Sequence, residues 1–470
     1  MANGRVFRHS TQLFRHYIPT EYFLLAVIEF LFLVLSLYLG LETRFLGDAW
    51  KANIGTFFPK AILYASVMLL SLIAFGLYQK QAARILEVMI LRVTAALLLG
   101  LIPLAASYYF APLFFLGRGV LLLTFGYSFV FILLVRLVFF YVVKSLDLLP
   151  RVLVLGAGKR ASLIRNSMDS GEVVGLNIIG YVALPGDEQD PTQSDNIALN
   201  APLSDFVEEN HVDEIVLAVD DRRAGLPTAD LVHCRMSGIE ILDLSTFFER
   251  RTGKILLEVL NPSWLYLSEG FRESLFSCVT KRGFDIAAVL LLLPIALPVM
   301  LLAAVLILLD SGGPVLYRQA RVGCRGKLFQ MYKLRSMIPN AEQDGVARWA
   351  AEDDARITRS GAILRRGRLD ELPQLFNILK GDMSFVGPRP ERPEFVSQLA
   401  ESLPYYCERH RVKPGLTGWA QIRYPYGDSE EDAREKLQYD LYYVKNYNML
   451  LDLLILLQTA EVVLLGEGAQ

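Results

Sequence analysis

Residues 281–309, KRGFDIAAVLLLLPIALPVMLLAAVLILL, decide how this chain folds. Their apolar run exceeds the roughly 20 residues that a helix needs to cross a bilayer. Lys281 and Arg282 precede the run, and Arg318 and Arg321 follow it. A crossing helix keeps its positive flank on one side of the membrane, so cations at both ends favour a segment that returns to the side it entered.

Two prolines, Pro294 and Pro298, lie in the middle of this run. Each removes a helix hydrogen bond and promotes a bend. The pattern predicts a re-entrant helix over residues 283–309, which enters one leaflet, breaks near Pro298 and returns. The alternative is a kinked helix that crosses the bilayer completely, and the charges at both ends disfavour it.

Downstream, residues 365–377, RRGRLDELPQLFN, combine arginines with two adjacent carboxylates, Asp370 and Glu371. Arginine forks match phosphate oxygens, and a carboxylate can hold a divalent cation beside them. A carboxylate can also attack phosphorus and form an acyl phosphate. The stretch indicates a helix start directed at an anion, although an isolated Asp-Glu pair more often belongs to a solvated, capped helix.

Two longer motifs follow, LKGDMSFVGPRPE at residues 379–391 and VKPGLTGWAQ at residues 412–421. Together with the Asp-Glu pair they resemble the bacterial sugar transferases, the monotopic phosphoglycosyl transferases that begin glycan assembly on polyprenyl phosphate. The resemblance runs from residue 281 to the C-terminus. It implies transfer of a hexose-1-phosphate from a UDP-sugar to polyprenyl (undecaprenyl) phosphate with release of UMP, in the exopolysaccharide-initiating type.

The resemblance also implies roles for individual residues. Asp370 would be the nucleophile, which forms an aspartyl-phosphosugar, and Glu371 would hold Mg²⁺, the expected cofactor. The family has a proline at the position of Pro298, although this chain has Leu297 where better-known members place a serine. Residues 313–323 and 329–337 are expected to form short strands and turns that carry several cations, and contact with lipid headgroups is the alternative to phosphate binding there. The residues expected to bind phosphate or nucleotide are Arg321, Lys333, Arg335, Arg365 and Arg389.

Residues 151–161, RVLVLGAGKRA, have the pattern of a buried strand, a glycine turn and a helix start, which opens a Rossmann-type unit. Gly156 and Gly158 form the candidate loop for a regulatory ligand. A dinucleotide site also needs an acidic residue at the end of the second strand, and the nearest one, Asp187, comes only after Pro185. NAD, another ligand and a purely structural role stay open. Further strands are expected at residues 177–183, 214–219 and 239–242.

The N-terminal part is predicted to be a bundle of membrane helices, because it contains four apolar segments of sufficient length. Cations before the first, between the second and third, and after the fourth segment favour a bundle with both ends in the cytoplasm. Arg136 lies in the fourth segment and is expected to snorkel to the interface or to serve a function. No cleavable signal peptide is expected, since the first apolar run starts late. The segments are residues 22–41, 57–78, 88–110 and 120–143.

The composition agrees with a membrane protein, since 53% of the 470 residues are hydrophobic. A net charge of −2 argues against a nucleic-acid partner. Four scattered cysteines and five histidines indicate neither a zinc site nor a disulfide framework. The expected parts are a transmembrane four-helix bundle (1–147), a Rossmann-like soluble α/β domain (148–260), a connector (261–280) and an α/β phosphoglycosyl transferase domain with the re-entrant helix (281–470).

The expected location is the bacterial inner membrane, with the active site on its cytoplasmic face. The front half resembles both the large members of the same transferase family, from which a homodimer is expected, and membrane-bound nucleotide-sugar dehydratases. The dehydratases carry a Tyr-x-x-x-Lys pair, and no tyrosine here has a lysine four positions later. A membrane-bound NAD-dependent nucleotide-sugar enzyme and a non-catalytic regulator of polysaccharide export remain as alternatives. No motif selects the sugar.

Overall fold

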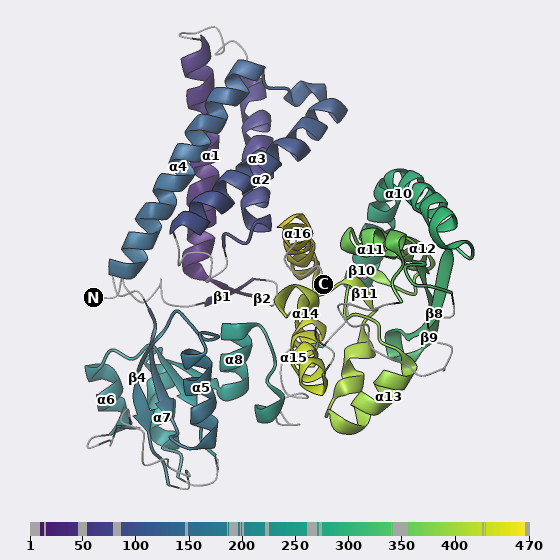
Figure 1. Cartoon of the computed structure of the whole chain (residues 1–470). Helices are drawn as coiled ribbons and strands as arrows, with labels where there is room; N and C mark the ends of the chain where they lie inside the picture. Colours follow the sequence, from purple (N-terminus) through teal and green to yellow (C-terminus); the bar gives the residue numbers. More distant parts are fainter. Residues whose placement is uncertain are drawn as a thin grey trace. The chain divides into compact units, whose positions relative to one another are not determined.

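The structure, a computed structural model, forms two compact units, residues 1–252 and 253–470, each of which is described by itself (Figure 1). The described residues are 10–13, 16–45, 54–78, 86–145, 149–185, 187, 196–197, 199, 202–220, 225–260, 270–271, 275–339, 341, 356–424, 427 and 429–465.

The first unit begins with a short hairpin and continues into long apolar helices. The hairpin pairs β1 (Ser10–Leu13) with β2 (His16–Pro19). Each helix has the length and hydropathy of a membrane span, as the sequence predicts. In Figure 1 they pack side by side, α1 against α2 and α4, and α2 against α3. The helices are α1 (Thr20–Phe45), α2 (Ile54–Ala74), α3 (Leu86–Phe110) and α4 (Arg118–Ser145).

Arg136 of α4 does not snorkel. It is only 5% exposed, and its Nε lies 2.8 Å from Oε1 of Glu29, a fully buried residue of α1. Its Nη1 donates to the carbonyl oxygen of Leu77 at 2.8 Å, and its guanidinium lies over the Tyr78 ring. Burial of the charge inside the bundle is possible because Glu29 neutralises it, and the sequence separation of the two residues hid that pairing.

The α/β part of the first unit is a five-stranded sheet with the order β5-β4-β3-β6-β7, and all its strand pairs are parallel. The first strand, β3, lies in the middle and is buried, with β4 on one side and β6 on the other. This arrangement matches a Rossmann-type half and confirms the predicted α/β fold. The strands are β3 (Arg151–Leu155), β4 (Asn177–Val182), β5 (Asn196–Ile197), β6 (Glu214–Leu217) and β7 (Glu240–Asp243), and the helices are α5 (Lys159–Asp169), α6 (Leu203–Glu209), α7 (Thr228–Met236) and α8 (Leu244–Thr252).

The second unit starts at Gly253, earlier than the expected domain boundary at residue 260. The reason is packing: Ile255, Leu257 and Leu260 are buried in one core cluster with residues of the C-terminal helices. Most of the expected connector, at 261–269 and 272–274, lies outside the described residues. Helix α10 (Leu275–Ser311) begins within the remainder of it.

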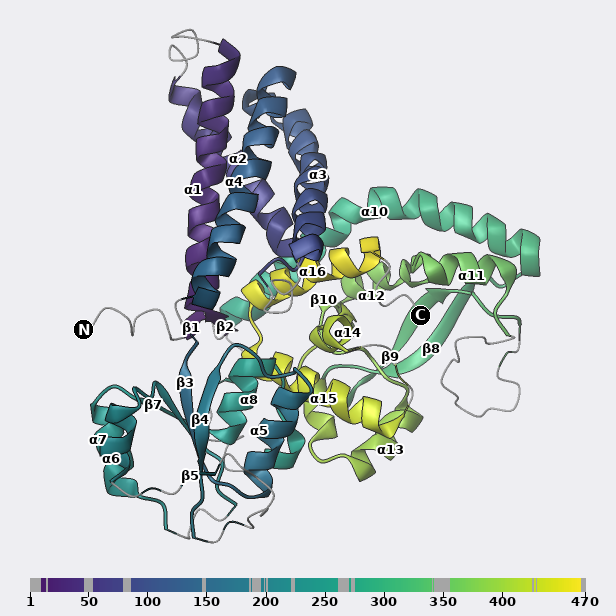
Figure 2. The ribbon, with the colours of Figure 1, turned by 60° about the vertical axis from the view of Figure 1, so that its left-hand side comes forward.

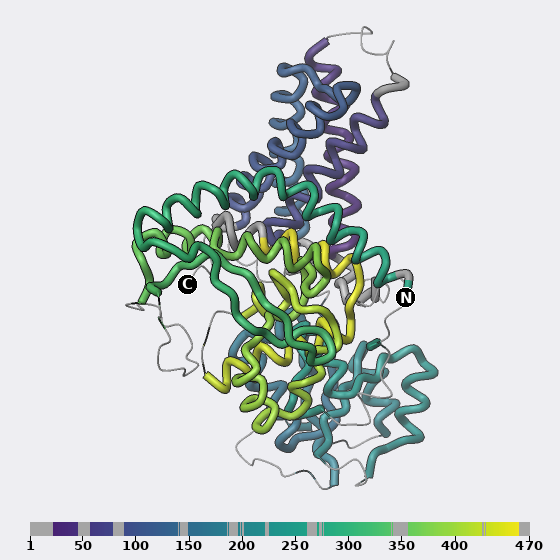
Figure 3. The backbone as a smooth tube through the Cα atoms, turned by 90° about the vertical axis from the view of Figure 1, so that its right-hand side faces the viewer, coloured from purple at the N-terminus to yellow at the C-terminus, as the bar shows by residue number. Residues whose placement is uncertain are grey.

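Helix α10 continues through both prolines over 37 residues and curves along its length, so the expected break near Pro298 does not end the helix (Figures 2 and 3). A proline costs a local hydrogen bond, and the bonds on either side of it carry the helix onward. One face of α10 packs against the unit through buried side chains, and the other face exposes large apolar ones. The buried apolar residues are Val289, Ala296, Met300, Ala303 and Ile307.

The rest of the second unit combines a hairpin with a helical core. Strands β8 (Leu316–Val322) and β9 (Leu328–Leu334) pair antiparallel, and β10 (Ser384–Val386) pairs parallel with β11 (Gly415–Thr417). Strands β8 and β9 confirm the short strands expected within residues 313–323 and 329–337. The helices are α11 (Arg359–Arg366), α12 (Gln374–Lys380), α13 (Pro393–Ser402), α14 (Trp419–Arg423), α15 (Glu430–Asn446) and α16 (Met449–Leu465), with short 3-10 turns at Cys324–Gly326, Leu369–Glu371 and Tyr406–Arg411.

Candidate active site

The Asp370-Glu371 pair lies in a 3-10 turn between α11 and α12. Thr358 caps the start of α11, where its side chain accepts from Gly361 N at 3.0 Å. Arg368 then takes a left-handed conformation, with φ of +50°, and turns the chain directly before the pair. Asp370 is only 7% exposed. The carboxylates are therefore set in a rigid turn and not on a solvated helix.

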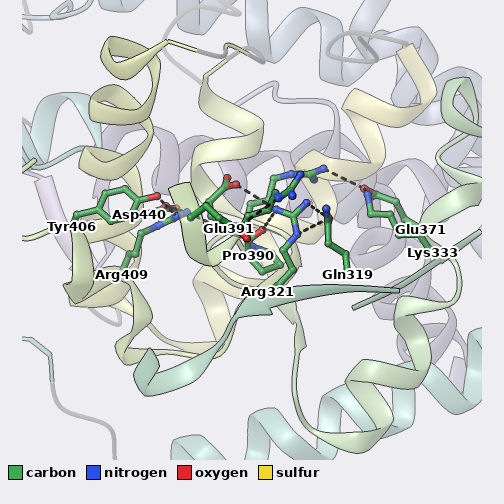
Figure 4. A network of polar contacts seen from close by, with 12 residues as sticks. Gln319, Arg321, Lys333, Glu371, Pro390, Glu391, Tyr406, Arg409 and Asp440 are labelled. Carbon is green, nitrogen blue, oxygen red and sulfur yellow. Dashed lines mark hydrogen bonds and ion pairs between the residues drawn. The ribbon is translucent and has the colours of Figure 1, made fainter. Parts of the chain in front are cut away.

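Two cations contact the Glu371 carboxylate. Lys333 of β9 donates to Oε1 at 3.0 Å, and Arg389 Nη2 lies 3.4 Å from the same oxygen (Figure 4). Burial alone would raise the pKa of Glu371, but the positive charges of Lys333 and Arg389 lower it to about 2. Glu371 is therefore ionised at any physiological pH.

Asp370 behaves in the opposite way. Burial raises its pKa above the ordinary aspartate value, and the negative charge of Glu371 raises it further. Lys333, Arg365 and Arg389 act against this rise. A carboxylate that is poorly solvated yet surrounded by cations suits a nucleophile, because it loses little hydration when it reacts with an anionic phosphate.

Asn377 of α12 fixes the position of Lys333 relative to this pair. Its side-chain amide donates to Gln330 O at 2.7 Å, and its Oδ1 accepts from Tyr332 N at 3.1 Å. The fully buried Asn377 thus ties the helix that follows the carboxylates to the strand that carries the lysine. No role was predicted for Asn377, because nothing in the local sequence indicates its partners.

Glycines hold the two long motifs together. A Cβ atom on Gly387 would lie 2.2 Å from Lys413 O, and one on Gly418 would lie 2.3 Å from Gly387 O. Such distances admit no side chain, so both positions need glycine. The GPRP and PGLTG turns therefore pack backbone against backbone, where β10 and β11 meet. Arg389 projects from this packed core towards Glu371.

The structure places the other predicted phosphate binders differently. Arg335 Nη2 donates to Ser311 O and Gly312 O, at 3.0 and 2.5 Å, and so caps the end of α10. Arg321 Nη1 donates to Pro390 O, in the loop directly after Arg389, at 3.1 Å. Arg365 Nε donates to Ser336 Oγ at 2.9 Å. The structure thus brings Lys333 and Arg389 into contact with Glu371, whereas Arg335 and Arg321 donate to backbone carbonyls away from the carboxylate pair.

Trp419 and the Lys-Gly-Asp turn have structural roles. Trp419 is 2% exposed, stacks with Tyr442 and donates through its indole N–H to Gly253 O at 2.8 Å. Gly381 ends α12 in a left-handed conformation, with φ of +95°. Trp419 therefore fills the core, and Gly381 terminates the helix.

A Mg²⁺ ion fits the carboxylate pair only with help from a substrate. Among the described residues, no group of three or more His, Cys, Asp and Glu side chains is arranged to hold a metal ion. Mg²⁺ commonly binds one or two carboxylates, and takes its remaining ligands from substrate phosphate and water. The ionised Glu371 supplies the hard oxygen donor for this mode of binding.

The glycine turn of the first unit is shaped by backbone packing. Gly156 has φ of +126°, and a Cβ atom there would lie 2.3 Å from Ala218 O, beyond the end of β6. Gly158 is the N-cap of α5 and has extended backbone. Both glycines lie where a Rossmann-type turn has them, as the sequence predicts.

Carboxylates of the chain itself occupy the N-terminus of α5. Asp220 accepts from the backbone N–H groups of Lys159 and Arg160, both at 2.9 Å. Asp187 Oδ2 accepts from Ala157 N at 3.0 Å and from Leu184 N at 2.9 Å. These N–H groups are the ones that would bind a dinucleotide pyrophosphate. A phosphate ligand would have to displace both carboxylates.

The fold and the site define a class of protein: a membrane protein with a buried aspartate beside a glutamate that two cations contact, an arrangement suited to phosphoryl transfer. The chain belongs to the bacterial sugar transferase family, whose sequence profile matches residues 276–466. The profile of a CoA-binding domain matches residues 73–223, across the last membrane helices and part of the α/β sheet.

Three relatives illustrate the family. The chain is 42% identical over 251 residues to the UDP-N-acetylgalactosamine-undecaprenyl-phosphate N-acetylgalactosaminephosphotransferase of Aeromonas hydrophila, covering 53% of this chain and 58% of that protein. It is 32% identical to the UDP-glucose:undecaprenyl-phosphate glucose-1-phosphate transferase of Xanthomonas campestris pv. campestris, covering 67% and 66%. It is 32% identical to the undecaprenyl-phosphate galactose phosphotransferase of Salmonella typhimurium, covering 68% and 69%.

The chain thus spans less than two thirds of the first two relatives. Their names also specify different sugars, so membership of the family does not select a donor.

Proposed function

We propose that this protein transfers a hexose-1-phosphate from a UDP-sugar to undecaprenyl phosphate and releases UMP. The observation that carries the proposal is the buried Asp370 beside an ionised Glu371, whose carboxylate Lys333 and Arg389 contact. The names of the three relatives describe this reaction for those proteins. The product would be the first lipid-linked intermediate of a polysaccharide.

The proposed mechanism has two displacement steps at one phosphorus atom. The Asp370 carboxylate attacks the sugar-linked phosphorus, an O–P bond forms, and the bridging P–O bond breaks so that UMP leaves with the electron pair. An oxygen of the lipid phosphate then attacks the same phosphorus and displaces the Asp370 carboxylate. Lys333 and Arg389 would neutralise the charge that develops on the phosphoryl oxygens and on UMP.

Mg²⁺ is the proposed cofactor, and Glu371 would hold it. When bound, the ion would neutralise the pyrophosphate of the donor. Glu371 suits this role because its depressed pKa keeps it ionised, whereas Asp370 is left to react. Activity that is unchanged after thorough chelation of divalent cations would contradict this part of the proposal.

We propose that α10 is re-entrant, as both of its ends contact the same compact unit. Near its start, Lys281 Nζ donates to Val386 O at 3.0 Å, and Asp285 accepts from Phe385 N at 3.1 Å. Near its end, Asp310 accepts from Ser360 N at 2.9 Å. A full crossing would separate the two ends by about 30 Å of hydrocarbon.

The exposed face of α10 supports the same arrangement, because it is apolar along most of its length. Leu291 is 73% exposed, Ile295 69%, and Leu301 69%, as expected for side chains that contact lipid. A nucleophile held against such a helix would work at the level of the lipid headgroups, where the acceptor phosphate is confined. The proposed location is the cytoplasmic face of the bacterial inner membrane.

Two cysteines on either side of the apolar run allow a test of this topology. Cys278 lies in the first turns of α10, and Cys324 lies beyond β8. In single-cysteine variants, a membrane-impermeant maleimide should label both from the cytoplasmic face only. A Cys407 variant, whose thiol is exposed in the same unit, serves as the reference. Labelling of Cys278 and Cys324 from opposite faces would establish a full crossing.

The experiment that tests the reaction is UMP release from a panel of UDP-sugars by the purified protein in nanodiscs, with and without undecaprenyl phosphate. We expect lipid-dependent release with one sugar and loss of it in Asp370→Asn. A folded wild-type protein that releases no UMP from any donor would overturn the proposal and favour a non-catalytic regulator. Mass measurement of the particles would test the homodimer, which is proposed only from the large family members.

A further inference from the structure

Arg389 contacts Glu371 from a loop whose backbone carbonyls accept hydrogen bonds from Arg409 and Arg321, both labelled in Figure 4. Arg409, at 5% exposed, donates from Nη2 to the carbonyl oxygen of Arg389 at 3.0 Å. Its Nη1 donates to the Tyr406 hydroxyl at 2.9 Å. The guanidinium therefore contacts the backbone of Arg389 and not the substrate side of the loop.

Asp440 of α15 holds Arg409 in place. Nε and Nη2 of Arg409 donate to Asp440 Oδ2 at 2.9 and 2.7 Å, and Asp440 is 2% exposed. The planar guanidinium of Arg409 donates hydrogen bonds to Asp440, Tyr406 and the carbonyl of Arg389, and these contacts together orient it more strictly than a single one would. The carbonyl of Arg389 is thereby tied to a helix whose neighbouring residues belong to the main core of the unit.

Arg321 of β8 binds the backbone of the next residue, Pro390. Its Nη1 donates to Pro390 O at 3.1 Å and lies 3.4 Å from Glu391 Oε2, while Gln319 Oε1 accepts from its Nη2 at 2.6 Å. Two consecutive carbonyls, those of Arg389 and Pro390, are thus bound by two different arginines. The prolines before and after Arg389 restrict the same backbone further.

We propose that Arg409, held by Asp440, is a positioning residue that fixes the backbone of Arg389 so that its guanidinium meets the donor pyrophosphate beside Glu371. This inference rests on the proposed function. A buried ion pair stabilises a fold no better than well-packed apolar residues do, so stability alone gives little reason for one at this place. Positioning supplies a reason, because a displacement of about 1 Å at a reacting site can cost about a hundredfold in rate.

A double-mutant cycle on kcat/KM for UMP release tests the proposal. Arg409→Lys keeps the charge but loses the fork, and should lower kcat/KM about tenfold, mainly through a higher KM for the UDP-sugar. In an Arg389→Ala background the same change should have less than about a twofold effect, because the group that it positions is gone. Equal effects in both backgrounds would overturn the proposal.

Two further variants keep the test decisive. Tyr406→Phe removes one hydrogen bond to Arg409 and little volume, so it can replace Arg409→Lys in the cycle if that variant does not fold. Lys254→Met breaks an ion pair to Glu435 on the same helix α15 and should change kcat/KM less than about twofold. A Lys254→Met effect as large as that of Arg409→Lys would mean that loosening α15 is sufficient, and would also overturn the proposal.

The outcomes separate this inference from the proposed function. A wild-type protein that releases no UMP would refute the reaction itself. A wild-type protein that is active, with additive losses in the cycle, would refute only the positioning role of Arg409. Thermal unfolding of each variant identifies those that have lost their fold.

Discussion

The two units each contain a turn that the sequence marks for an anionic ligand, and the structure treats them in opposite ways. At the start of α5, the backbone N–H groups are bound by Asp187 and Asp220. In the turn before α12, Lys333 and Arg389 contact the carboxylate of Glu371. In the first turn the N–H donors are satisfied by the chain's own carboxylates, whereas in the second two cations contact Glu371.

The difference shows that a glycine turn and a helix start are not sufficient for a phosphate site. Such a turn can bind phosphate only if its backbone N–H groups are not already bound by side chains of the same chain. Within the second turn, burial raises the pKa of both carboxylates, and the positive charges outweigh it only at Glu371.

The largest effect is expected from the carboxylate pair. Asp370→Asn should lower UMP release by at least roughly 10³-fold, because it removes the nucleophile. The matched change in the other turn, Asp187→Asn, should leave the rate of release within about twofold of wild type, since it lies outside the reacting site. Initial rates at saturating donor measure both. A severe loss in Asp187→Asn would mean that the two turns are coupled.

A smaller effect with a pH signature is expected from Lys333→Met. The positive charge of Lys333 opposes the burial that raises the pKa of Asp370, so its removal should raise that pKa further. Asp370 must be ionised to attack, and activity is therefore expected to fall at a higher pH than in wild type as the solution is acidified. The measurement is the pH profile of kcat/KM.

The loss in kcat/KM of Lys333→Met at neutral pH should be about 10- to 100-fold. Lys380→Met, which removes an exposed lysine paired with Asp382, is the control and should leave the profile in place. An acid limb that stays where it is in Lys333→Met, or moves to lower pH, would contradict the charge balance described for Asp370.

The glycine turn of the α/β domain should be sensitive in stability and not in catalysis. Gly156→Ala should destabilise the domain by about 2–4 kcal/mol, because the new methyl group would meet Ala218 O and the backbone is left-handed. Gly238→Ala shares the positive φ but meets nothing within 4 Å, so it should cost only about 1 kcal/mol. Thermal unfolding of the full chain, with UMP release as a second readout, separates the two.

The smallest effect is expected from nucleotide ligands of the first unit. CoA or NAD⁺ at about 1 mM should not shift the unfolding temperature measurably, because Asp187 and Asp220 already bind the N–H groups that would hold a phosphate. A UDP-sugar with Mg²⁺, which binds the other unit in the proposed function, is the positive control. A clear shift with CoA would show that the carboxylates are displaced, and would restore a regulatory ligand for this domain.

Several features of the fold were determined by local sequence. The long apolar segments have a length and hydropathy that few soluble structures tolerate, and the alternation of strands and helices around residues 151–243 restricted the α/β domain to a parallel sheet. Pro294 and Pro298 predicted a bend in the membrane helix, and α10 bends, although it remains one helix over Leu275–Ser311. The Asp-Glu pair and the cations near it lie in a few sequence motifs, and the resemblance to the family indicated that these motifs form one site.

The tertiary structure alone decided which charges meet. Arg136 pairs with Glu29 from another helix, Asn377 binds the strand of Lys333, and Arg409 binds the carbonyl of Arg389. Arg335, expected to bind phosphate, donates to the carbonyl oxygen of Gly312 at the end of α10. Each of these contacts joins residues far apart in the chain, and their strength depends on burial that arises only when the elements pack. The sequence therefore identifies the charged residues of this protein, while packing determines which of them bind other parts of the protein and which lie beside the carboxylate pair.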